Sequence, residues 1–292
     1  MNQEFLPAAA LYSFYVCIAA LAAGALTGWA LLLSPAGWAG GRSEAAPSAE
    51  FANRLGRWAL RAGLAALSLS LVARGVAAQR PPFGSQYEFA IAFAWAALGV
   101  ALVVERGERR PGLWFAASVA ALLVLVYAST LPSALLPPVP ALQNRPLLAL
   151  HVGAAVLAYG ANAAAFAGAA MYLLQRAALR RRWRLSRALP PLRTSDELSY
   201  RAVMIGFPML GATLLFGSWW ASIAWGFYWN WDPKETATLA TWLVYGVYLH
   251  ARIRRSWQGP AGAWLLVLGF ALTLFTYAGN TFFNSLHSYS GL

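Results

Sequence analysis

Charged residues are scarce in this sequence. Only 11% of its 292 residues are charged and only ten are acidic, whereas 60% are hydrophobic. Soluble domains usually contain about 25% charged and about 45–50% apolar residues. Ten carboxylates are too few to solvate the surface of a globular chain of this length. The composition therefore excludes a soluble enzyme and a disordered chain, and it indicates an integral membrane protein.

Cysteine is almost absent. The single Cys17 excludes a disulfide scaffold and a thiolate metal cluster, and the sequence contains no CxxCH motif for covalent haem attachment. The sequence therefore predicts that this chain carries no covalently attached haem of its own. Histidine is nearly as rare, with three residues: His151, His250 and His287.

Long apolar runs dominate what is present. A membrane-spanning helix needs roughly 20 mostly apolar residues, and no run shows the alternation of a β-barrel strand. The first run follows no basic residue and is too long for a secretory signal, which indicates a retained helix. We therefore predict one all-α, polytopic membrane domain over 1–292. Its eight predicted transmembrane helices are 8–33, 57–78, 87–104, 113–131, 147–175, 202–220, 236–253 and 262–282.

The basic residues predict the orientation of this bundle. Of the 22, 18 flank the loops that follow the first, third, fifth and seventh runs, and four lie on the other side. Under the positive-inside rule the first set is cytoplasmic, so both termini are extracytoplasmic. The alternative, that arginines form an RNA-binding patch, is disfavoured because loop asymmetry accounts for them. We therefore expect the lipid bilayer, and no nucleic acid, as a partner.

Tryptophan is concentrated in and around the external loop between the sixth and seventh predicted helices. Six of the 14 Trp residues lie between Trp219 and Trp242. An aromatic belt at the membrane interface is one explanation. The other is an apolar platform for a planar ligand, since Trp offers a large π surface for stacking.

The loop ends in Asp232-Pro233-Lys234-Glu235, which predicts the start of a helix. Asp232 is a preferred N-cap, Pro233 suits the first helical position, and Glu235 completes a capping box. Capping gives no reason for Lys234, whose ammonium group could meet a carboxylate such as a haem propionate.

The histidines divide into two predicted groups. His151 and His287 lie near the outer ends of their helices, on the side of the Trp-rich loop, where two imidazoles could ligate a haem iron axially. His250 follows Pro233 by 17 residues, or about 25 Å of helix, and must lie towards the cytoplasmic side. Unrelated interfacial histidines are the alternative for both groups.

Three segments resemble one family. The sequence WGFYWNWDPKE at 225–235, the LHSYSGL ending at 286–292, and the His151-Val152 pair that opens a helix are similar to the CcsA (ResC) family of cytochrome c biogenesis proteins. The resemblance covers 147–292, which would form the haem-handling core, whereas 1–146 contributes four helices without a clear motif.

The resemblance implies specific roles for the site residues. His151 and His287 would ligate external haem iron, and His250 would ligate haem within the membrane together with a histidine of a CcsB (ResB)-type partner. The aromatic motif would comprise Trp225, Trp229 and Trp231 with Asp232.

The implied function is haem export and covalent attachment of haem b to an apocytochrome c that carries a CxxCH motif. The site would face outward from a bacterial cytoplasmic membrane. This chain supplies no catalytic nucleophile, so it would act as a synthase subunit mainly by templating. The alternative is a haem exporter or chaperone that delivers haem to a separate ligase, as in the CcmC and CcmF families. A transporter for an unrelated solute would leave the Trp-rich loop unexplained.

Overall fold

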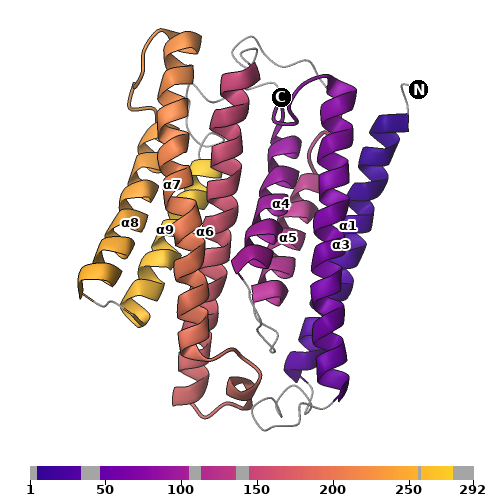
Figure 1. The fold of residues 1–292 in the computed structure, drawn as a ribbon, viewed down its shortest axis with the longest axis vertical. Coiled ribbons are helices and arrows are strands. Elements are labelled where there is room, and N and C mark those ends of the chain that lie inside the picture. Colours follow the sequence, from indigo (N-terminus) through magenta and orange to yellow (C-terminus); the bar gives the residue numbers. More distant parts are fainter. Residues whose placement is uncertain (1–4, 34–46, 105–112, 136–144, 256–257, 279–292) are drawn as a thin grey trace.

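A computed structural model describes residues 5–33, 47–104, 113–135, 145–255 and 258–278. These residues form an antiparallel bundle of long helices, and no strand occurs among them (Figure 1). The predicted all-α membrane bundle is therefore confirmed. Its elements are α1 (Phe5–Leu33), α3 (Pro47–Ala78), α4 (Gln86–Val104), α5 (Leu113–Ser129), α6 (Arg145–Arg180), the 3-10 helix η2 (Arg184–Arg187), α7 (Leu192–Trp225), α8 (Pro233–Arg255) and α9 (Pro260–Ala278).

Each of the eight predicted helices corresponds to one α-helix, but several helices continue beyond their apolar run. α3 begins at Pro47 rather than at 57, and α7 covers Leu192–Trp225 rather than 202–220. An apolar run marks the part of a helix that lies in hydrocarbon. Arg, Glu, Ala and Leu are good helix formers, so the backbone stays helical past the point where hydropathy falls.

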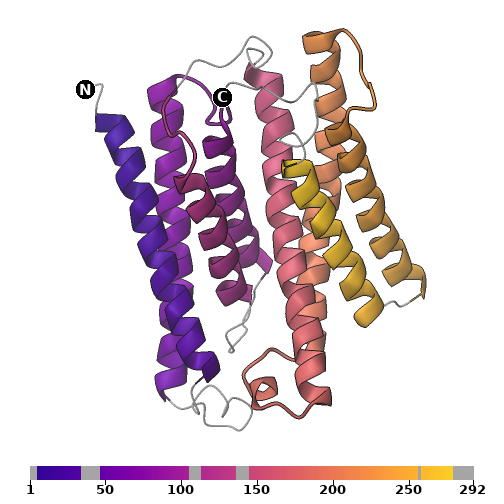
Figure 2. The same ribbon diagram turned by 180° about the vertical axis from the view of Figure 1, so that it is seen from behind.

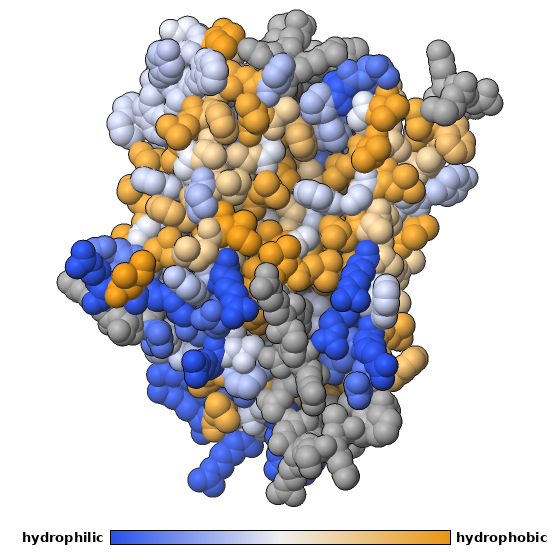
Figure 3. All heavy atoms as spheres, in the orientation of Figure 1, coloured by the Kyte–Doolittle hydropathy of each residue, from blue (hydrophilic) through white to orange (hydrophobic). Residues whose placement is uncertain are grey.

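Six of the helices are long and apolar enough to cross a membrane, which indicates a multi-pass membrane protein. Side chains such as Leu215 (73% exposed) and Leu26 (70% exposed) point away from the bundle, as expected for surfaces that meet lipid. Figure 3 shows hydrophobic residues over the upper and middle surface and hydrophilic residues gathered below them. We call the lower end, which carries η2, the Arg-rich end, and the opposite end the Trp-rich end.

The helices form two groups that α4 and α6 join. α1 packs on α3 and α5 in one group, and α6 packs on α7 and α9 in the other, with α8 against α9 (Figure 2). Gly160 of α6 permits the joint, because a Cβ there would lie 2.6 Å from the backbone carbon of Ala96 in α4. Small residues at such crossings let helix backbones approach closely in lipid.

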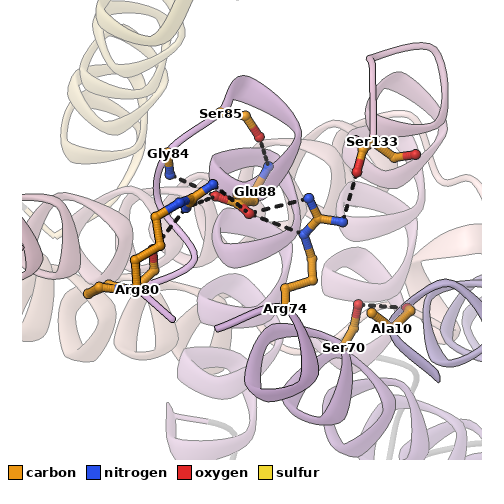
Figure 4. A network of polar contacts seen from close by, with 9 residues as sticks. Ala10, Ser70, Arg74, Arg80, Gly84, Ser85, Glu88 and Ser133 are labelled. Carbon is orange, nitrogen blue, oxygen red and sulfur yellow. Dashed lines mark hydrogen bonds and ion pairs between the residues drawn. The ribbon is translucent and has the colours of Figure 1, made fainter. Parts of the chain in front are cut away.

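A buried ionic network fixes the turn between α3 and α4 at the Trp-rich end (Figure 4). Glu88 is fully buried and accepts hydrogen bonds from Arg74 (3.3 Å), Arg80 (2.7 Å) and the Gly84 backbone N–H (2.7 Å). Arg74 also donates to the Ser133 carbonyl at 3.0 Å. Only four basic residues lie on the Trp-rich side of the bundle, and Arg74 and Arg80 are two of them. Glu88 compensates part of their charge, which explains why they can be buried there.

Candidate haem-binding site

His151 lies in the second turn of α6, at the Trp-rich end of the bundle. Its Nδ1 is 3.0 Å from the backbone carbonyl oxygen of Thr213 in α7. A carbonyl oxygen can only accept a hydrogen bond, so Nδ1 carries the proton. In a neutral imidazole the lone pair then resides on Nε2. Metal-ligating histidines have this arrangement, in which one ring nitrogen binds the metal and the other donates its N–H to a carbonyl or carboxylate oxygen.

A glycine of α7 makes room for this imidazole. A Cβ at Gly217 would lie 2.7 Å from Cε1 and 2.9 Å from Nδ1 of His151, closer than side chains normally approach. Thr213 and Gly217 are four residues apart and therefore share one face of α7. This face forms a socket for His151 that a larger residue at Gly217 would occupy.

The socket is completed by Trp220, whose ring is parallel to that of His151. The interplanar angle is 2° and the ring centroids are 6.2 Å apart. Trp220 is 2% exposed and contacts Trp225 edge to face, with centroids 4.7 Å apart. These rings pack in an apolar cluster that includes Leu147 and Val152 of α6. The α6–α7 interface therefore holds the imidazole in one orientation.

Other aromatic side chains in the loop and in the last turns of α7 remain exposed. Trp231 is 70% exposed and Trp219 is 55% exposed, whereas Trp229 contacts Trp231 edge to face with centroids 5.7 Å apart. Trp231 has a φ of 55°, a left-handed conformation that bulky residues rarely adopt and that stores strain. Gly226, with a φ of 85°, ends α7 in the same region at little steric cost.

The predicted capping box at the start of α8 is present. Oδ1 of Asp232 accepts a hydrogen bond from the backbone N–H of Lys234 at 2.9 Å, and Oε2 of Glu235 accepts one from the N–H of Asp232 at 3.3 Å. Glu235 also accepts from the N–H of Asn230 at 3.0 Å. Because Asp232 is 5% exposed, its carboxylate acts in the described structure as a cap. Lys234 is partly buried beside it.

His250 lies near the other end of α8. It is exposed on the helix surface and lines an open, apolar groove of about 430 Å³ between α7 and α8. Phe207 and Trp242 stack in the groove wall, with ring centroids 5.1 Å apart and an interplanar angle of 8°. The 17 residues from Pro233 correspond to about 25 Å of helix. His250 therefore lies far from the Trp-rich loop, towards the other end of α8.

The sequence model of the family described as Cytochrome C assembly protein matches residues 83–287. The chain belongs to the cytochrome c assembly protein family. The matched range contains all three histidines and the Trp-rich loop, and it also includes Glu88 of the buried network.

This family member is similar to curated proteins named Cytochrome c biogenesis protein CcsA, in agreement with the sequence resemblance. It is 51% identical to that of Guillardia theta over 102 residues, which are 35% of this chain and 34% of the relative. It is 49% identical to that of Gloeobacter violaceus over 100 residues, 34% of this chain and 30% of the relative. The matched segments thus span only about a third of each relative.

A solved structure has the same fold. It is named Cytochrome c Heme Lyase CcmF and matches with a TM-score of 0.66 at 18% sequence identity, covering 95% of this chain and 47% of that chain. At this identity the likeness concerns the fold. Nearly the whole bundle of this family member therefore has a counterpart within a longer chain.

The structure brings only some of the predicted site residues together. His151 lies beside Trp220, which in turn contacts Trp225, whereas His250 lies in its own groove. His287 is outside the described residues. Sequence reasoning did not identify Thr213 and Gly217, because nothing in the sequence of α7 marks them as neighbours of a histidine 62 residues or more away.

Proposed function

We propose that this chain binds haem at its Trp-rich end and positions it for covalent attachment to an apocytochrome c. The observation that carries the proposal is the orientation of His151: its Nδ1 donates to the Thr213 carbonyl, so the lone pair of the neutral imidazole lies on Nε2, the atom that can ligate iron. His287 would supply the second axial ligand. Trp225, Trp229 and Trp231 would contact the ring, beside the cap formed by Asp232, and Lys234 would meet a propionate of haem b.

The chemistry assigned to this chain is templating. A thioether forms when a cysteine S–H adds across a haem vinyl C=C bond, a step that needs no further nucleophile and no oxidant. The chain's own Cys17 is fully buried in α1, so the reacting thiols belong to the CxxCH motif of the apocytochrome. The contribution of the chain is to orient the vinyl groups and to hold the iron until the substrate histidine replaces a ligand.

A second haem position would include His250. The exposed imidazole borders an apolar groove, and a partner of the CcsB (ResB) type would supply the opposite axial ligand. With the Arg-rich end in the cytoplasm of a bacterium, haem would pass from the His250 position to the Trp-rich end, which faces outward from the cytoplasmic membrane.

One reconstitution tests this function directly. The chain and its partner are co-expressed with an apocytochrome c in a host that lacks other maturation factors. Formation of covalent holocytochrome supports a synthase subunit. Haem that reaches the outer side without thioether formation would instead favour an exporter or chaperone that serves a separate ligase.

Histidine variants test the assignment of ligands. His151→Ala and His287→Ala are each expected to abolish holocytochrome formation, and added imidazole should restore part of it by filling the vacated axial position. His250→Ala should lower the total haem that co-purifies. Full maturation by either outer variant would refute ligation by His151 and His287.

A further inference from the structure

One face of α8 carries four residues at intervals of four: Trp242, Gly246, His250 and Arg254. Residues four apart lie above one another on a helix. Trp242 and Arg254 are separated by 12 residue steps, or about 18 Å along the helix axis. Trp242, Gly246 and His250 line the groove between α7 and α8, so Arg254 continues the direction of the groove towards the Arg-rich end.

The groove is shaped for a flat apolar surface. A Cβ at Gly246 would lie 3.3 Å from the ring of Phe207, so the glycine lets α7 and α8 approach while Phe207 stacks on Trp242. The remaining lining residues, Leu243, Val247 and Ala251, are aliphatic. His250 alone among the seven lining residues has an ionisable side chain, and it can ligate a metal at the centre of a planar ligand.

The structure distinguishes between the two arginines that follow His250. The side chain of Arg252 is only 8% exposed and is paired with Asp196 at 2.8 Å and Glu197 at 3.7 Å. Its guanidinium carbon also lies 4.5 Å from the ring centroid of Tyr200. Arg254 is exposed. At the left edge of Figure 3, hydrophilic residues lie next to hydrophobic ones at the lower end of α8. Arg252 is thus committed to α7, and Arg254 is available to a ligand in the groove.

We propose that Arg254 binds the carboxylates of haem in this groove, so that the ring lies flat along α8 with its propionates towards the Arg-rich end. This inference rests on the proposed function. A carboxylate is costly to place in hydrocarbon without a partner, and a guanidinium pairs with carboxylates through two parallel hydrogen bonds. Arg254 would therefore set which edge of the ring faces the membrane surface, while His250 sets the position of the iron.

The test compares two ligands that differ only in their carboxylates. The full chain with His151→Ala, which removes the proposed outer ligand, is purified in detergent and titrated with haemin or with haemin dimethyl ester. Arg254→Gln should weaken haemin binding by about tenfold or more, the effect of losing a charge-assisted hydrogen bond. It should leave binding of the dimethyl ester unchanged, which also shows that the variant is folded.

Matched variants complete the test. Arg193→Gln removes an exposed arginine at the start of α7 and should change neither titration. Equal loss of both ligands in Arg254→Gln, or no loss of haemin, would overturn the role of Arg254. If His250→Ala binds both ligands as the parent does, the groove itself is not a haem site and the proposed function loses its second position.

Discussion

The imidazole of His151 and the indole of Trp220 lie in parallel planes, 2° apart in orientation, with ring centroids separated by 6.2 Å. The two rings come from different helices, α6 and α7, which pack more extensively on each other than any other pair among the described elements. The α6–α7 interface therefore sets the orientation of His151, the predicted iron ligand, and also positions Trp220 just before the Trp-rich loop. A change at this interface should therefore alter the spectrum of bound haem even when no proposed iron ligand is replaced.

Gly217→Ala tests this dependence. The new Cβ would lie 2.7 Å from Cε1 of His151, so the imidazole must move, at a cost typical of overpacking, about 1–3 kcal/mol. We expect a changed Soret spectrum and reduced maturation. The control is Gly153→Ala in α6, where nothing lies within 4 Å of the new Cβ and Ala favours the helix by about 1 kcal/mol. Equal behaviour of the two variants would contradict the socket.

Asp232 variants separate capping from haem binding. Asp232→Ala removes the acceptor for the Lys234 backbone N–H and should destabilise the start of α8 by about 0.5–2 kcal/mol. Asp232→Asn keeps an N-cap but loses the negative charge. Thermal unfolding and maturation are measured for both variants. If Asp232→Asn has the stability and the maturation activity of the parent, Asp232 acts only as a helix cap. If it has the stability of the parent but lower maturation activity, the carboxylate also contributes to haem binding.

Glu88→Gln should strongly destabilise the protein. Arg74 and Arg80 would remain buried without a carboxylate, and disruption of a buried ion pair costs about 3–5 kcal/mol. The measurement is the midpoint of thermal unfolding in detergent. Glu50→Gln is the matched control, because its pair with Arg54 is about two-thirds exposed on both sides and should contribute less than about 1 kcal/mol. Similar midpoints for the two variants would be inconsistent with the network.

The orientation of the bundle can be tested with reporters. A fusion after Leu292 should be active on the extracytoplasmic side, and an insertion near Arg182 should be cytoplasmic, because most basic residues flank the Arg-rich end. Paired reporters that function in opposite compartments provide the measurement. The reverse result at either position would move the proposed haem site to the other side of the membrane.

The sequence predicts the parts of this structure that depend on local patterns. Apolar runs identify all eight helices, and the order of Asp232, Pro233 and Glu235 identifies the start of α8. It does not predict contacts that depend on how helices pack. The pairing of Glu88 with Arg74 and Arg80, the fit of His151 against Gly217, and the choice of Arg252 over Arg254 as the partner of Asp196 all required the arrangement in space.

The charges of α8 have a consequence for biosynthesis. α8 has 23 residues but is not among the six helices apolar enough to cross a membrane unaided. Its basic last turns and polar first turn must nevertheless be accommodated beside α7 and α9. A segment of this kind partitions poorly from the translocon into lipid by itself. We therefore expect α8 to remain in the translocon until α9 has been synthesised. The segment that carries His250 would then enter the bilayer together with α9, as a helical hairpin.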